Sequence, residues 1–145
     1  MIPKRGRDIG YQILSLQRHF PQLNYSKTKR AWIGDLQPTP DSMIFRVGIF
    51  YKGALPPKVY LLRPMLADNA PHVYRKDGSL CVYYFADWTW SEDKHLASTI
   101  VPWTIVWLYF YEIWLETGEW LGDEAPHKSR EVKSLRSDRV CQRVA

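Results

Sequence analysis

The sequence contains only two cysteines, Cys81 and Cys141, among its 145 residues. Two thiols are too few for a disulfide framework or for a four-thiolate zinc site. The first residues are charged and are not followed by an apolar run, so no signal peptide is expected. We therefore expect a cytoplasmic protein in which both thiols stay reduced.

Several motifs that carry familiar chemistry are also missing. There is no glycine-rich phosphate loop, no nucleophile-elbow serine motif and no His-Glu-x-x-His metalloprotease motif. The sequence has no close pair of cysteine and histidine ligands. The acidic series Glu112, Glu116 and Glu119 is interpreted as a solvated helix edge. The sequence thus predicts neither a metal site nor a bound cofactor.

Basic charge is scarce in the middle of the chain, although the net charge is +5. Residues 1–30 carry seven Lys and Arg against one acidic residue, whereas residues 31–122 carry seven against ten. Basic ends are commonly solvated, so nucleic-acid binding is not favoured, and the end charge can equally steer an acidic protein partner. A nucleic-acid binder that uses residues 1–30 stays open as a third interpretation, and it predicts affinity that falls steeply with salt.

What is present is the pattern of one folded domain. Hydrophobic residues make up 46% of the chain and aromatic residues 14%, which excludes disorder for most of it. A helix is predicted over 8–20, because apolar residues recur there at helical spacing: Ile9, Ile13, Leu16 and Phe20. Its solvent side is expected to carry Arg7, Gln12, Gln17 and Arg18.

Strand-like runs follow this helix. Residues 24–30 are polar and are predicted to form a loop. Three runs rich in β-formers then occur at 31–36, 43–51 and 58–62, separated by turns that contain proline or glycine. Short strands joined by short turns favour an antiparallel meander.

Residues 100–115 form the most apolar run. A membrane span needs about 20 apolar residues, and this run of 16 is interrupted by polar and proline residues. We predict a buried core helix that is capped by Thr99 or Ser98 and ends at Gly118.

Two stretches have no clear periodicity. The irregular stretch over 64–98 is long for a compact domain, and long ordered loops are usually functional. The polar residues 123–145 are predicted to form a short helix or a tail. The main domain is therefore placed at residues 1–122.

Cys81 lies in the irregular stretch, at the end of the segment PHVYRKDGSLC, which spans residues 71–81. A lone cysteine is often only a small buried apolar side chain. Cys81 follows an Asp-Gly turn and has the polar residues His72 and Asn69 upstream, which favours a catalytic thiol. Cys141 lies in the polar tail and has no such surroundings.

The segment 71–81 resembles the active-site segment of ubiquitin-conjugating (E2) enzymes. In that family His-Pro-Asn, Val/Ile-Tyr, an Asp/Gly turn and Ile/Leu precede the catalytic cysteine. A second match is PPKV at residues 56–59, which in that family precedes the third strand. The N-terminal helix, Trp88 or Trp90 after the cysteine, and the apolar helix occur in the family's order over residues 8–122.

The resemblance implies a fold and a site. The implied fold is α+β and E2 (UBC)-like, with an N-terminal helix, a four-stranded antiparallel meander, an active-site loop and a central buried helix. Cys81 takes the position of the catalytic cysteine. Where the family has His-Pro-Asn, this chain has Ala70-Pro71-His72 and one extra residue before the cysteine. His72 is thus the candidate hydrogen-bond donor to the oxyanion, and Asn69 is the alternative.

The activity that the resemblance implies is acyl transfer through a Cys81 thioester. The expected partner is a protein with a reactive C-terminus: a ubiquitin-like protein or, by general likeness to stand-alone E2 proteins of short type II CBASS antiphage operons, a cyclic nucleotide synthase. The sequence has no adenylating signature, so a separate activating enzyme is expected to supply the acyl group. A catalytically silent E2-like interaction module is the alternative, and no membrane partner is expected.

Overall fold

The computed structural model describes residues 9–84 and 87–122. Within them a helix is followed by four strands, a short 3-10 helix and a long second helix, which confirms the predicted α+β fold. The elements in chain order are α1 (Ile9–His19), β1 (Leu23–Ser26), β2 (Ala31–Leu36), β3 (Phe45–Lys52), β4 (Leu55–Arg63), η2 (Leu96–Ser98) and α2 (Ile100–Thr117).

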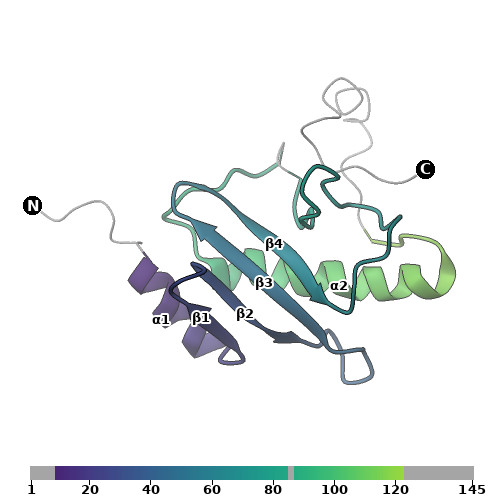
Figure 1. Cartoon of the computed structure of the whole chain (residues 1–145), viewed down its shortest axis with the longest axis horizontal. Coiled ribbons are helices and arrows are strands. Elements are labelled where there is room, and N and C mark those ends of the chain that lie inside the picture. The colour runs from purple at the N-terminus through teal and green to yellow at the C-terminus, as the bar shows by residue number, and fades with distance from the viewer. Residues whose placement is uncertain (1–8, 85–86, 123–145) are drawn as a thin grey trace, which may run out of the picture.

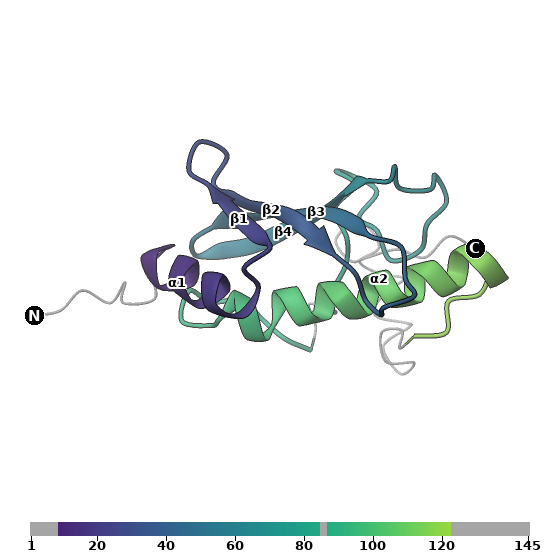
Figure 2. The ribbon, with the colours of Figure 1, turned by 90° about the horizontal axis from the view of Figure 1, so that it is seen from below.

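The four strands form one antiparallel meander in the order β1-β2-β3-β4 (Figure 1). Both helices lie on the same face of this sheet, and α2 runs beneath the strands (Figure 2). Side chains alternate between the two faces of a strand, so every second residue of the sheet points toward the helices. The core therefore lies between the sheet and α2, and its largest buried strand residues are Trp32, Leu36, Phe45, Val47, Ile49 and Val59.

The first strand corrects the sequence-based prediction of a loop over 24–30. Leu23 and Tyr25 of β1 pair with Gly34 and Trp32 of β2, and the rings of Tyr25 and Trp32 lie 4.7 Å apart. Gly34 is required there, because a Cβ at this position would lie 2.1 Å from the carbonyl oxygen of Gln22. Only two apolar residues in this four-residue strand face the core, which is too short a pattern to recognise in the sequence.

The fourth strand begins earlier than predicted. The sequence predicts a turn over Pro56 and Pro57 and a strand over 58–62, but β4 already begins at Leu55 and contains both prolines. Because β4 is an edge strand, it tolerates prolines, which cannot donate a backbone hydrogen bond. The turn between β3 and β4 is confined to Gly53 and Ala54, where Gly53 has a φ of +69°.

Helix α1 packs as predicted with one exception, Gln12. Leu16 is buried and Ile9, Ile13 and Phe20 pack against the core. Gln12 was assigned to the solvent side, but it is fully buried.

The long helix is the predicted core helix and extends to Thr117. The Gly118 N–H donates to the carbonyl oxygen of Trp114, and Gly118 has a φ of +81°, which makes it the predicted helix end. Thr99 occupies the N-cap position, but its hydroxyl donates to the carbonyl oxygen of His95 rather than capping α2. By length and composition alone, the region Leu96–Thr117 could cross a membrane, but its buried side chains pack in the core beneath the sheet.

The segment between β4 and η2 is irregular, as predicted. In the described part of this segment, an isolated antiparallel bridge pairs Val73 with Leu80. The predicted helix or tail over 123–145, with Cys141, lies outside the described residues, so the domain boundary at residue 122 stays a prediction.

Candidate functional site

A tight hairpin precedes Cys81. The Tyr74 N–H donates to the Ser79 carbonyl oxygen at 2.8 Å, and the Gly78 N–H donates to the Tyr74 carbonyl oxygen at 2.7 Å. Gly78 has a φ of +79°, which favours glycine at this position. Asp77 stabilises the turn, because its Oδ1 accepts hydrogen bonds from the Ser79 N–H at 2.9 Å and the Ser79 hydroxyl at 2.7 Å.

Two hydrogen bonds attach this hairpin to the rest of the domain, and a third joins its two arms. The Leu80 N–H donates to the carbonyl oxygen of Val59 in the edge strand β4 at 2.7 Å. The carbonyl oxygen of His72 accepts from the Cys81 N–H at 2.9 Å and from the Trp107 indole N–H of α2 at 3.1 Å. The backbone of Cys81 is thus fixed between the edge of the sheet and the long helix.

Cys81 itself is buried, with only 7% of its surface exposed, and it is disulfide-bonded in this structure. This oxidation state differs from the expected reduced thiol, and Cys141 lies outside the described residues. The Cys81 Sγ lies 3.2 Å from the Tyr83 carbonyl oxygen and 3.6 Å from the Tyr74 hydroxyl oxygen. A disulfide sulfur carries no proton, so in this state the Tyr74 hydroxyl can only be the donor.

Tyr74 is a site residue that the sequence analysis did not assign. Burial, and then the neighbouring Tyr83 and Asp77, raise the pKa of Tyr74 to about 12. Its phenol therefore stays protonated and can donate a hydrogen bond at neutral pH. The tyrosine belongs to the motif that suggested the resemblance, but only the hairpin shows that its hydroxyl lies near the sulfur.

The structure places the two predicted oxyanion donors differently. His72 is directly paired with Cys81 through the backbone, has a φ of +56°, and keeps only 8% of its surface exposed. Its ring lies 4.9 Å from the ring of Trp120. Asn69 is exposed in a turn closed by the Ala70 N–H and the Ala67 carbonyl oxygen, and within the described chain no hydrogen bond joins it to Cys81.

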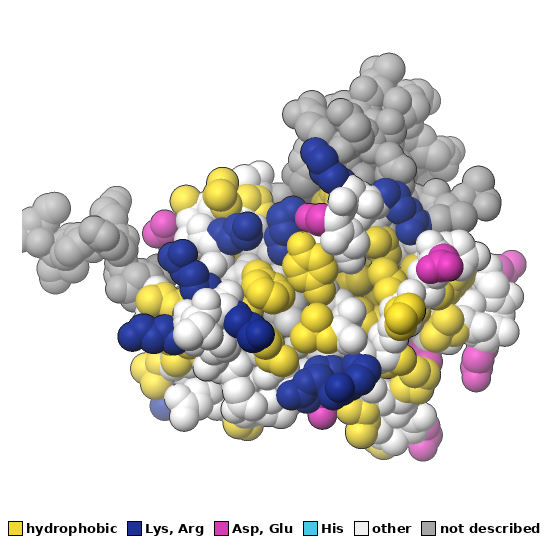
Figure 3. All heavy atoms as spheres, in the orientation of Figure 1, with side chains coloured by type: hydrophobic (Ala, Val, Ile, Leu, Met, Phe, Trp, Pro, Cys, Tyr) yellow, Lys and Arg dark blue, Asp and Glu magenta, His cyan; other side chains and the backbone are white. Residues whose placement is uncertain are grey.

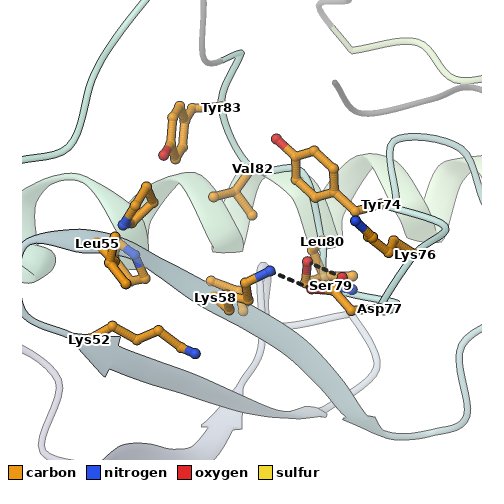
Figure 4. A pocket seen from close by; sticks show the side chains of 13 residues that line it. Lys52, Leu55, Lys58, Tyr74, Lys76, Asp77, Ser79, Leu80, Val82 and Tyr83 are labelled. Carbon is orange, nitrogen blue, oxygen red and sulfur yellow. Dashed lines mark hydrogen bonds and ion pairs between the residues drawn. The ribbon is translucent and has the colours of Figure 1, made fainter. Parts of the chain in front are cut away.

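A pocket of about 470 Å³ lies beside the Cys81 segment (Figure 4). The start of β4 forms one side, and the residues before and after Cys81 form the other. It is lined by Lys52, Leu55, Pro56, Pro57, Lys58, Val59, Tyr74, Lys76, Asp77, Ser79, Leu80, Val82 and Tyr83. The PPKV motif thus contributes to the same pocket as the segment that contains Cys81.

Asp77 is the acidic residue in this lining. Its carboxylate forms an ion pair with Lys58 at 2.5 Å, drawn as a dashed line in Figure 4. Partial burial tends to raise the pKa of Asp77, but the hydrogen bonds from Lys58 and Ser79 outweigh it and lower the pKa to about 2. Asp77 is therefore ionised and already engaged at neutral pH.

The two tryptophans that follow Cys81 have different positions. Trp90 is buried, and its indole N–H donates to the Gly53 carbonyl oxygen at 2.7 Å. Trp88 is half-buried, and its ring lies 4.8 Å from Tyr83 and 4.7 Å from Trp103. Trp90 therefore fixes this segment to the β3–β4 turn, whereas Trp88 belongs to an aromatic cluster beside the cysteine.

Residues 9–84 and 87–122 contain no cluster of three His, Cys, Asp or Glu side chains that could hold a metal ion. Glu112 has a structural contact, because its Oε2 accepts from the Met43 N–H at 2.6 Å.

Comparison with known proteins gives one informative result. No curated protein matches the sequence. The family described as type II CBASS E2 protein matches residues 12–128, which include most of α1, the whole sheet, Cys81 and all of α2. The helix, antiparallel sheet and long helix agree with an E2-like fold. The chain therefore belongs to the type II CBASS E2 protein family, the stand-alone E2-like proteins of these antiphage operons.

Proposed function

We propose that this protein is an E2-like conjugating enzyme in which Cys81 carries an acyl group as a thioester. The observation that carries this proposal is the position of Cys81: a hairpin, β4 and α2 hold its backbone, and a pocket of about 470 Å³ lies beside it. Fixed placement of a nucleophile next to a substrate-sized pocket is what acyl transfer requires.

The proposed chemistry has two steps. The reduced Cys81 thiolate attacks the carbonyl carbon of an activated donor, a new S–C bond forms, and the donor's previous leaving group departs. A lysine amine then attacks the thioester carbon, the C–N bond forms, and the C–S bond breaks to return the Cys81 thiolate. The second step passes through a tetrahedral oxyanion, for which we propose His72 as the donor, with Asn69 and the Tyr74 hydroxyl as alternatives.

We further propose that the donor is a protein with a reactive C-terminus, either the cyclic nucleotide synthase of the operon or a ubiquitin-like protein. Membership of the CBASS family supports a protein partner from the same operon. A separate activating enzyme is expected to supply the acyl group. A cytoplasmic location belongs to this proposal, because the cytosolic glutathione pool keeps an accessible thiol reduced.

In the test, the protein is mixed with a candidate donor, an activating enzyme and ATP. A phosphine reductant is included because it reduces disulfides without attacking thioesters. We expect a covalent adduct on a non-reducing gel that disappears after addition of a thiol. Cys81→Ser should give an ester adduct that resists the thiol, and Cys81→Ala should give none. Cys141→Ser is the matched control and should behave like the wild type. An undiminished adduct in Cys81→Ala would end the proposal.

The alternative function is a catalytically silent E2-like interaction module. The low exposure of Cys81 is the observation that favours it. The same assay separates the two functions, because a silent module binds the donor tightly while the wild-type protein forms no adduct.

A further inference from the structure

The pocket beside Cys81 has an excess of positive charge. Of its three lysines, Lys58 is neutralised by the ion pair with Asp77. Within residues 9–84 and 87–122, Lys52 and Lys76 have no acidic partner, and both side chains are exposed. Figure 3 shows Lys and Arg side chains around the apolar surface of this face, with most acidic side chains near its margins. The Glu92 carboxylate lies near Gly53, beside Lys52, but no ion pair joins the two among the described residues. A ligand in the pocket therefore meets two lysines that are not engaged in ion pairs.

No side chain in the pocket lining is suited to remove a proton near neutral pH. The Asp77 carboxylate has a pKa of about 2 and accepts hydrogen bonds from Lys58 and Ser79. The Tyr74 phenol has a pKa of about 12 and stays protonated. An acceptor lysine that attacks the thioester must therefore lose its proton to solvent before the attack.

Lys52 and Lys76 repel a cationic peptide, so a segment that carries the acceptor lysine needs a carboxylate beside that lysine to offset their charge.

We propose that this pocket binds the acceptor segment, and that Lys52 and Lys76 contact an acidic side chain next to the acceptor lysine. The inference rests on the proposed thioester function. In the reaction, the neutral lysine amine attacks the thioester carbon, the C–N bond forms, the C–S bond breaks so that the Cys81 thiolate leaves, and the remaining extra proton on the nitrogen passes to solvent. The acidic side chain only positions the peptide and takes no part in bond making.

The test compares the wild type with the double variant Lys52→Glu/Lys76→Glu after loading of the thioester. Discharge is measured to two peptides that contain one lysine flanked by either Glu or Gln, and to ethanolamine. We expect the double variant to lose at least tenfold in rate with the Glu peptide and less than twofold with ethanolamine, with loading unchanged. Lys29→Glu, an exposed site outside the pocket, is the matched control and should retain the wild-type rates.

We also expect the double variant to prefer peptides of the opposite charge from those that the wild type prefers. A peptide with Arg in place of Glu should react faster with the double variant than with the wild type. Equal wild-type rates for the Glu and Gln peptides would overturn the proposal, as would a loss of loading in the double variant, which would assign the lysines to the donor instead.

Failure of the thioester function is recognised separately, because the wild type would then form no adduct. In that case the Glu and Gln peptides are given a fluorescent label, and their binding to the unloaded protein is measured at low salt. At least fivefold tighter binding of the Glu peptide, lost in the double variant, supports the acidic-segment site. Equal binding of the Glu and Gln peptides overturns it.

Discussion

Tyr74 and His72 are both candidate hydrogen-bond donors to the oxyanion that forms at Cys81. The Tyr74 hydroxyl lies 3.6 Å from the Cys81 sulfur, whereas His72 is paired with Cys81 through its backbone and packs its ring against Trp120. A donor that stabilises the oxyanion must reach the carbonyl oxygen attached to the sulfur. The contribution of each side chain can be measured by the rate at which a loaded variant discharges.

We expect Tyr74→Phe to slow discharge of the thioester to lysine by at least about tenfold, because it removes one donor near the reacting carbonyl. The effect should be constant from about pH 6 to pH 9, since the raised pKa keeps the phenol protonated throughout. His72→Ala, measured in parallel, should retain loading while its discharge slows at least tenfold. If Tyr74→Phe discharges at the wild-type rate, the hydroxyl is not an oxyanion donor.

At the residue scale, sequence reasoning reaches the residues that a motif names. Cys81 and His72 were identified because the segment 71–81 follows a recognisable order around an Asp-Gly turn. The position of the Tyr74 hydroxyl depends on how the hairpin brings it toward a sulfur seven residues later. That distance is set by backbone geometry, so the sequence alone does not predict it.

At the scale of elements, α1 is attached to the rest of the domain through Gln12. Its side-chain N–H donates to the Lys94 carbonyl oxygen at 2.8 Å, and its Oε1 accepts from the Leu96 N–H at 3.1 Å. Leu96 is fully buried, so its N–H depends on this glutamine. The helical pattern assigned Gln12 to solvent because periodicity measures polarity and does not reveal buried hydrogen-bond partners.

Gln12→Ala should lower the free energy of unfolding by about 1–3 kcal/mol, because it leaves the buried Leu96 N–H without its acceptor. Urea unfolding followed by tryptophan fluorescence measures the difference. Gln17→Ala on the exposed side of the same helix is the control, and a change within about 0.5 kcal/mol is expected there. Equal stabilities of the two variants would show that the Gln12 hydrogen bonds contribute nothing net.

The strands also show that a residue pattern does not reveal which partners a segment pairs with. The long apolar strands β2 and β3 were predicted near their observed positions, because their alternating or continuous apolar residues extend over several positions. The short strand β1 and the start of β4 were missed, because only their pairing with β2 and β3 reveals them. The correct count of four strands came from the family resemblance rather than from the residue pattern.

At the scale of the whole molecule, the Cys81 segment is part of the folded core rather than a separate loop. Leu80 is bonded to β4 and His72 to α2, and Val73 and Leu80 are buried in the core between them. The Ser42 N–H, by contrast, is bonded within a local turn, to the Thr39 carbonyl oxygen. A nucleophile that is held by the sheet and the long helix together should stay in place until the domain unfolds.

Native-state hydrogen exchange tests this coupling. The Leu80 and Cys81 amides should exchange with free energies close to that of global unfolding, because breaking their hydrogen bonds requires separation of the hairpin from β4 and α2. The Ser42 amide should exchange at least about 100-fold faster after correction for intrinsic rates, since opening its turn breaks only contacts within residues 37–42. Fast exchange at Leu80, similar to that of Ser42, would mean that the Cys81 segment opens independently of the core. The nucleophile would then be positioned by its bound substrate instead of by the fold.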